Sequence, residues 1–286
     1  MAMVMWSFAF PIAEVLMETW GTVAVVFWRM LIGVVALVLF WLWQDGWAKV
    51  ANANWRRGIF VGGIGFGIGS VTFLVGQAMS DAVTPAIAAA MMPIFGAFLE
   101  TLLDGRRMRF RLVLGIIFAL GGGLLATGIR FGDGSFGWGS LLCVLSVILF
   151  AWATRATTRD FPMLTFVGQT AITLSGAQVV VTVIYFGMIF LGLSGTEVGS
   201  VAPLHLGLLV FSSIASAALA QSLWIHGAAG LGILLASFHM NAVPFYVMVV
   251  VVLFLDGSWN WWQAGGAALV ALGVWVAQSG ARGARR

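Results

Sequence analysis

The residues best able to do chemistry are a few polar side chains set inside long apolar runs. Glu14 and Arg29 lie in the first two runs, and His239 and Asn241 lie close together in a later one. If these runs cross a membrane, each such group is costly unless it faces a protein interior or a water-filled cavity. These four residues are therefore candidate contacts for a solute, for a proton or for one another.

Glu14 and Arg29 would both lie toward the same side of the membrane, because the first run leads outward and the second returns. We interpret them as a structural ion pair. The alternative is that Glu14 binds a proton or a cationic solute, since the short string AEVLMET around it resembles the first helix of small multidrug pumps.

His239 and Asn241 precede a proline, Pro244, which lies within a run, as Pro93 does earlier in the chain. A proline inside a helix removes one backbone hydrogen bond and frees a carbonyl, so Pro93 and Pro244 are candidate hinges. The two polar residues lie about 200° apart on a regular helix. They are substrate contacts or, alternatively, partners in interhelical hydrogen bonds.

Aromatic and flexible side chains supply the other candidate binding residues. Flat aromatic walls with few charges suit an apolar or zwitterionic solute. The remaining tryptophans are expected in interfacial belts, and ordinary core packing is the alternative for the methionines. Together with His239 and Asn241, the candidate substrate-binding residues are Trp6, Ser7, Met91, Met92, Trp152, Gln221 and Trp224.

No pattern in the sequence indicates catalysis, a metal or a cofactor. His205, His226 and His239 fall at an outer helix end, an inner helix end and a mid-helix position, so they cannot form one metal site. The glycines from position 58 to position 69 suit close helix packing better than phosphate binding. An intramembrane enzyme, with Ser212, Ser213 or Ser216 meeting His239, is the remaining catalytic alternative. Cys143, the single cysteine, is expected to be buried.

Composition decides which solvent these runs meet. The chain of 286 residues is 61% hydrophobic and 8% charged, with a mean hydropathy of +1.04. A soluble domain carries about 25% charged residues, so lipid must be the main solvent. The net charge of +4 comes from short basic clusters between apolar runs, which is typical of membrane topology and not of nucleic-acid binding.

A spanning helix needs about 20 apolar residues. Charge clusters and Gly, Pro and Asn residues divide the chain into ten candidate spans. With the N-terminus inside, nearly all of the 14 basic residues fall in cytoplasmic segments, which predicts that both termini are cytoplasmic. The expected spans are 2–18, 21–43, 58–79, 82–103, 110–130, 137–155, 163–193, 203–225, 230–255 and 260–280.

The two halves of the chain repeat one another. Pro93 corresponds to Pro244, Asp104–Gly105 to Asp256–Gly257, and Trp6 to Trp152. Each half contributes five spans, an odd number, so the second half must insert upside down. The sequence thus predicts an all-α membrane protein with a 5+5 inverted repeat, residues 1–134 and 135–286. Such repeats are typical of secondary transporters that bind their solute near the midplane.

In the order and spacing of these residues the chain resembles the EamA branch of the drug/metabolite transporter superfamily. The resemblance rests on Trp6-Ser7, Arg29, Glu100, Trp152, Trp224 and the segment from Asn241 to Pro244. It implies a basket of ten helices whose central cavity is lined by helices 1, 3, 4, 6, 8 and 9. It also implies export of amino acids or similar metabolites. The second half lacks an equivalent of Glu100, which we interpret as an interfacial anchor.

We therefore expect a monomeric transporter in the bacterial inner membrane. It would export apolar or aromatic amino acids by alternating access, with lipid and the small solute as its only partners. The alternative is a proton-coupled exporter of cationic drugs that uses Glu14.

Overall fold

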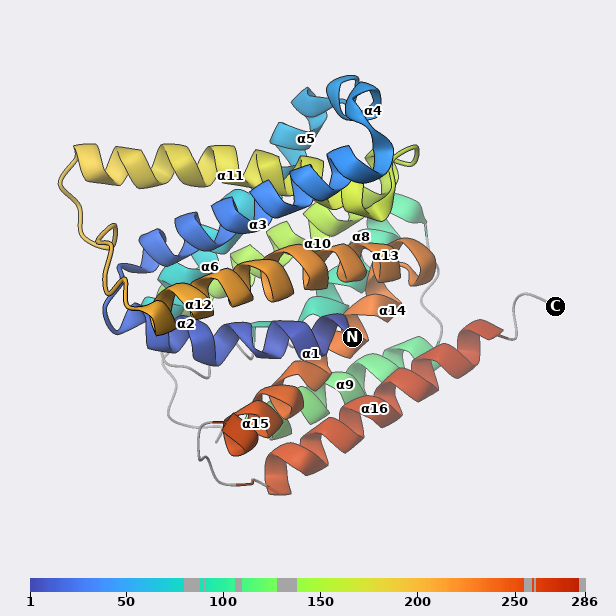
Figure 1. The fold of residues 1–286 in the computed structure, drawn as a ribbon. Helices are drawn as coiled ribbons and strands as arrows, with labels where there is room; N and C mark the ends of the chain where they lie inside the picture. Colours follow the sequence, from blue (N-terminus) through green and yellow to red (C-terminus); the bar gives the residue numbers. More distant parts are fainter. Residues whose placement is uncertain are drawn as a thin grey trace.

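A computed structural model describes residues 1–79, 88–89, 91–105, 110–127, 138–254, 259 and 261–282. Within these residues all regular secondary structure is helical. Most of the helices run along one common direction, with consecutive long helices antiparallel (Figure 1). The arrangement is that of a helical bundle.

The first half of the chain begins with two short helices and one long one. Its elements are α1 (Ala2–Ser7), α2 (Ala9–Met17), α3 (Thr22–Asp45), α4 (Trp47–Ala51), α5 (Trp55–Val61), the π-helical segment η1 (Gly62–Ile68), α6 (Gly69–Ala78), α8 (Met92–Asp104) and α9 (Phe110–Thr127).

The second half begins with two long helices and ends with one. Its elements are α10 (Trp138–Asp160), α11 (Phe166–Phe190), α12 (Pro203–Ser212), the π-helical segment η2 (Ser213–Ala220), α13 (Gln221–Leu231), α14 (Ile233–Ser237), the 3₁₀ segment η3 (Phe238–Ala242), α15 (Val243–Phe254) and α16 (Trp261–Arg282).

These helices make the chain a multi-pass membrane protein. In the part of the chain that the structure describes, five helices are long and apolar enough to cross a bilayer: Thr22–Asp45, Trp55–Ala78, Leu141–Asp160, Phe166–Phe190 and Pro203–Leu231. The other five expected spans also contain helices, among them α9 with 18 residues and α16 with 22. Residues 80–87 and 90 of the fourth span lie outside the described residues. The count of ten spans and their inverted order remain predictions.

Side chains and backbone geometry explain where several helices begin and end. Asn54 accepts a hydrogen bond from the Arg57 backbone N–H at 3.2 Å, and Thr165 accepts one from Gly168 N–H at 3.2 Å. Both contacts satisfy backbone donors that a first helical turn leaves without a partner. Gly105 ends α8 with a φ of +64°, a conformation that favours glycine.

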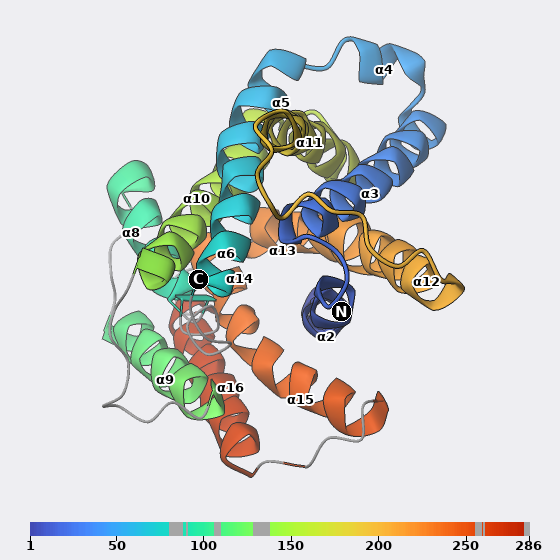
Figure 2. The ribbon, with the colours of Figure 1, turned by 90° about the vertical axis from the view of Figure 1, so that its left-hand side faces the viewer.

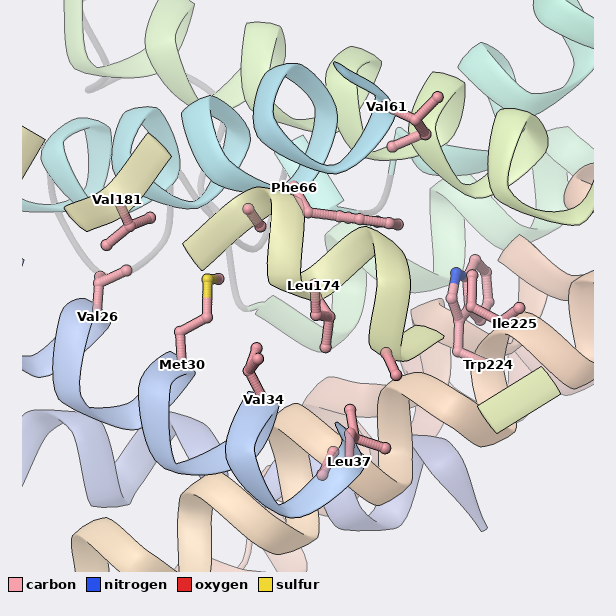
Figure 3. Close-up of a cluster of buried hydrophobic side chains, with 14 of the residues drawn as sticks. Val26, Met30, Val34, Leu37, Val61, Phe66, Leu174, Val181, Trp224 and Ile225 are labelled. Atoms are coloured by element: carbon pink, nitrogen blue, oxygen red, sulfur yellow. The ribbon is translucent and has the colours of Figure 1, made fainter. Parts of the chain in front are cut away.

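The largest buried cluster joins both halves of the chain. Figure 3 shows Val34 and Leu37 of α3 facing Leu174 of α11, with Phe66 of η1 on one side and Trp224 of α13 on the other. Phe66 and Trp224 expose 1% and 4% of their surface. The core is therefore built between the halves and not inside each of them.

Glycines allow the central helices to approach closely. A Cβ added at Gly62 would lie 1.7 Å from the Thr173 carbonyl oxygen of α11, and one at Gly65 would lie 2.1 Å from the Ala153 Cβ of α10. No side chain fits at either position. The prediction that the glycines of this segment serve helix packing is confirmed.

Helix pairing in the structure crosses between the halves in a matched way. η1 packs against α10 and α11, and η2 packs against α1 and α3. Two further pairs, α8 with α14 and α9 with α16, also join the halves. Figure 2 shows α9, α15 and α16 together on one side of the molecule and α5 and α11 on the other.

Candidate functional site

Two indole rings meet where α1, α10 and the η2–α13 helix come together. The ring centroids of Trp6 and Trp224 lie 5.6 Å apart, with an angle of 43° between the planes. Trp6 Nε1 donates to the Ser216 carbonyl oxygen at 3.0 Å, and Trp224 Nε1 donates to Thr154 Oγ1 at 3.0 Å. Both indole N–H groups are thus satisfied, which fixes the orientation of the rings.

Backbone irregularity helps to form this site. Ser216 lies in the π-helical η2, and its hydroxyl donates to the Met5 carbonyl oxygen of α1 at 2.8 Å. α1 and η2 therefore exchange two hydrogen bonds through one residue. π-helical segments are rare and often occur at functional sites. Trp224 is buried while Trp6 is only partly buried, so the ring of Trp6 is the more accessible of the two.

Trp152 does not join this pair. Its ring packs edge-on against Phe60 of α5, with centroids 6.0 Å apart. Trp152 precedes Thr154 by two residues, which places it about 200° around α10 from the residue that binds Trp224. Trp152 therefore lies apart from the Trp6–Trp224 pair, and its role as a substrate contact stays a prediction.

Gln221 and Ser7 are both buried polar residues, with different surroundings. Gln221 directly follows η2 and exposes 6% of its surface, and within the described residues its Nε2 group has no hydrogen-bond partner. Ser7 is fully buried, but its hydroxyl donates to the Val4 carbonyl oxygen of its own helix at 2.6 Å. Gln221 thus retains a free donor, while the donor of Ser7 is already used.

The two candidate methionines lie at the start of α8. Met92 exposes 2% of its surface and belongs to the main core, whereas Met91 is partly buried. Core packing, which was the alternative to a substrate contact for both methionines, therefore describes Met92.

Both candidate hinge prolines lie near the start of an α-helical element. Pro93 is the second residue of α8, and Pro244 is the second residue of α15. A proline is tolerated in a first turn because its missing N–H would have no helical partner there. The mid-helix placement is therefore wrong for Pro93. Pro244 lies inside the continuous helical run that α14, η3 and α15 form from Ile233 to Phe254. The side chains of Pro244 and Asn241 lie outside the described residues.

His239 lies in η3, the break before α15, and its side chain is exposed. Its Nδ1 atom is 3.2 Å from the Leu235 carbonyl oxygen. A carbonyl only accepts, so Nδ1 carries the proton and Nε2 keeps its lone pair for another partner. An exposed imidazole within a membrane span favours a position on a water-filled cavity.

The ion pair expected between Glu14 and Arg29 does not form. Glu14 is exposed, whereas Ile12 and Leu16, two positions to either side, are buried against the core. Helical periodicity therefore turns Glu14 away from the packed face of α2. Arg29 is partly buried, and neither residue has an ion-pair partner within the described part of the chain.

Sequence reasoning missed Thr154 as a site residue, and it considered Ser216 only as part of an enzyme. Both are small hydroxyl residues in apolar helices, and such residues carry no recognisable pattern. Glu100, which the sequence indicates as an interfacial anchor, has a buried side chain. Among the described residues no group of three His, Cys, Asp or Glu side chains could hold a metal ion. Cys143 is buried, as expected.

Comparison with known proteins agrees with this architecture. Residues 1–128 match the model of the EamA-like transporter family, which covers somewhat less than half of the chain. The members of that family are membrane transporters and not enzymes. No sequence among the curated proteins matches the chain. One crystal structure of a protein superposes over 98% of this chain and 95% of its own, with a TM-score of 0.82 and 17% identity, which shows a shared fold.

Proposed function

We propose that the chain is a transporter that exports apolar or aromatic amino acids by alternating access between its two halves. The observation that carries this proposal is the exchange of partners between the halves. η1, in the third expected span, packs on the first two helices of the second half, and η2, in the eighth, packs on helices of the first two spans. Inverted repeats related by a two-fold axis give this pattern.

Irregular backbone supports the same reading. π-helical segments occur in the third and eighth expected spans, and helix breaks precede Pro93 and Pro244 in the fourth and ninth. Irregular backbone at membrane depth is tolerated where it is buried in protein or lines a water-filled cavity. These matched breaks can absorb the change when the cavity opens to one side and then to the other.

The substrate class follows from the chemistry of the site. Trp6 presents a partly buried aromatic face, and His239 has a ring nitrogen that can accept. Gln221 has an amide donor with no partner among the residues that the structure describes. An amino acid with an apolar or aromatic side chain offers a matching carboxylate, ammonium group and hydrocarbon body. We further propose a monomer in the bacterial inner membrane, with both termini cytoplasmic and with no cofactor.

Flux in proteoliposomes tests the proposal. Purified protein is reconstituted and assayed with radiolabelled leucine, phenylalanine, tryptophan, glutamate and lysine, with and without a pH gradient. We expect saturable flux of the first three amino acids that unlabelled substrate inhibits and that persists without the gradient. Protein-free liposomes and the Trp224→Ala variant serve as controls. Absence of saturable amino-acid flux would overturn the substrate assignment.

One observation favours a second candidate, a proton-coupled exporter of cationic drugs. Glu14 is exposed and forms no ion pair with Arg29, which leaves its carboxylate available for a proton or a cation. Flux of a quaternary ammonium dye that needs both a pH gradient and Glu14 would support this candidate over the first.

A further inference from the structure

α8 carries two carboxylates, one helical turn apart, that bind two different elements of the second half. Glu100 exposes only 6% of its surface, and its Oε1 atom accepts a hydrogen bond from the Leu234 backbone N–H at 3.0 Å. Leu234 lies in the first turn of α14, where backbone donors have no helical partner. Glu100 thus caps a helix that is 134 residues away in the chain.

Asp104 makes the second connection, to α10. Its Oδ2 atom accepts from Arg155 Nε at 2.8 Å, and its Oδ1 atom accepts from Arg159 Nη1 at 2.6 Å. Arg155 also reaches Oδ1 through Nη2, so the two groups pair through both oxygens. Such two-point pairs are directional as well as strong. The end of α8 is therefore held at a defined place on α10.

A small apolar cluster closes the space behind the two carboxylates. A Cβ at Gly96 would lie 3.3 Å from Leu234 Cα, so α8 and α14 approach closely there. Ala97 packs with four residues of α9, α14 and η3, which are Ile116, Leu234, Leu235 and Phe238. The contact between α8 and α14 is thus dry, with Glu100 as its buried polar member.

We infer that the contact between α8 and α14 is a gate in the transport pathway, and that Glu100 and Asp104 are the positioning residues that hold it closed. The gate lies at the end of the bundle that carries Arg57, Arg155 and Arg159, called the arginine-rich end below. The inference rests on the proposed function. α8 begins at the break that contains Pro93, and α14 leads directly into η3 and the break at Pro244. Both gate helices are therefore joined to a point where the regular α-helix of their span is interrupted.

The neighbouring helices are less able to move. α5 and η1 are locked against α11 by glycine contacts that leave no space for a Cβ. Arg57 and Asp160 tie α5 to α10 at the same end of the bundle, with Arg57 Nε donating to Asp160 Oδ2 at 2.8 Å. Because Asp104 is 35% exposed, water can replace its arginine contacts when α8 moves. The latch can thus open while the glycine-packed helices stay together.

Thiol accessibility tests the gate directly. Cys143→Ala removes the single native thiol, and Ser237→Cys places a reporter on α14, at a fully buried position one turn beyond Leu234. A membrane-impermeant maleimide is added to sealed vesicles of each orientation. With the latch intact, we expect slow labelling from the arginine-rich side.

Two conservative variants release the latch. Glu100→Gln keeps an oxygen for the Leu234 N–H but removes the charge, and Asp104→Asn breaks both arginine pairs. We expect the double variant to label about tenfold faster from the arginine-rich side only, because the open fraction of a two-state equilibrium rises as the closed state loses contacts. Asp160→Asn is the matched control, since it removes an ion pair at the same end without touching α8, and its labelling should stay slow.

The outcomes separate the gate from the proposed function. If amino-acid flux is saturable but the double variant labels no faster than Asp160→Asn, the gate inference is wrong and the transporter proposal stands. If labelling rises on one side while no amino acid on the panel is transported, the gate stands and the substrate assignment fails. Equal acceleration from both sides would indicate general loosening and would also overturn the gate. A change in Vmax at constant KM is expected for the latch variants.

Discussion

The indole N–H of Trp6 donates a hydrogen bond to the Ser216 carbonyl oxygen across 3.0 Å, although the two residues are 210 positions apart in the chain. Ser216 lies in η2, where the wider π-helical turn displaces carbonyl groups from the regular α-helical ladder. The irregular backbone of one half therefore holds the aromatic side chain of the other. This contact places Trp6 against Trp224 and forms the wall of the candidate site.

The first prediction concerns this hydrogen bond. Trp6→Phe keeps an aromatic ring but removes the N–H, so the Ser216 carbonyl loses a partner at a cost of about 1 kcal/mol. We expect KM for an aromatic amino acid to rise several-fold in proteoliposome flux, with little change in the amount of folded protein. Trp275→Phe is the control, because Trp275 is 69% exposed on α16. Equal KM values for the two variants would contradict a role for Trp6 at the site.

The second prediction concerns helix packing. Gly62→Ala places a Cβ where the Thr173 carbonyl oxygen lies 1.7 Å away, so α11 must shift. Overpacking of this kind typically costs about 1–3 kcal/mol, and the melting temperature in detergent, followed by tryptophan fluorescence, should fall by several degrees. Gly207→Ala has no atom within 4 Å of the added Cβ and should melt like the parent protein. If both variants melt alike, the close approach does not limit stability.

The third prediction is a pH dependence. A side-chain hydrogen bond from Arg155, aided by the charges of Arg155 and Arg159, holds the pKa of Asp104 below its ordinary value despite some opposing desolvation. The folded-state pKa is therefore lower than the unfolded value of about 3.9. Asp104 then contributes stability that is fully present above that value and is lost as the pH falls through the folded-state pKa.

Asp104→Asn measures this contribution. Because the Asp104 side chain is 35% exposed, the difference in unfolding free energy should be about 1 kcal/mol or less. Thermal melts of parent and variant between pH 3 and pH 7 should differ by a constant amount near neutrality and converge at the acid end. A difference that grows on acidification would reverse the predicted sign.

The fourth prediction separates the two candidate transport mechanisms. Glu14 lies on the exposed face of α2, away from the indole pair. We expect Glu14→Gln to leave both the rate of amino-acid flux and its pH dependence unchanged. Glu18→Gln, four residues further on the same exposed face, is the control. Loss of flux together with loss of pH dependence in Glu14→Gln alone would favour proton coupling.

The fifth prediction concerns the acceptor nitrogen of His239. Its Nδ1 atom faces the Leu235 carbonyl, so Nε2 is the atom available to a substrate ammonium group. His239→Gln should raise KM several-fold, because the amide cannot reproduce both contacts in the same geometry. His226→Gln is the control, since His226 packs against Phe166 with ring centroids 4.9 Å apart. An unchanged KM would remove His239 from the site.

The apolar runs of the sequence become helices in the structure, because few backbone conformations are stable in lipid. Every N–H and C=O group must find its partner within the segment, so a long run without charges becomes a helix whatever it packs against. The glycine positions of η1 were predictable for the same local reason. A residue without a side chain in a spanning helix indicates close approach by a neighbour.

Much of the site was not predictable in this way. Trp6 and Trp152 are equivalent by sequence position, yet the first meets Trp224 and the second packs on Phe60. The ion pair expected between Glu14 and Arg29 does not form, because two residues at the same depth in the membrane can still point in different directions. The direction in which a side chain points depends on how its helix is rotated against its neighbours.

The sequence by itself determined that the chain spans a membrane, which segments are helical and which residues recur in both halves. Composition and periodicity are local properties, so they can be read from the chain alone. Only the tertiary structure decided that Glu100 is buried and caps α14, that Thr154 and Ser216 hold the two indoles, and that Pro93 begins its helix. These contacts join residues 70 to 210 positions apart. Their geometry depends on packing between helices, which no local pattern in the chain records.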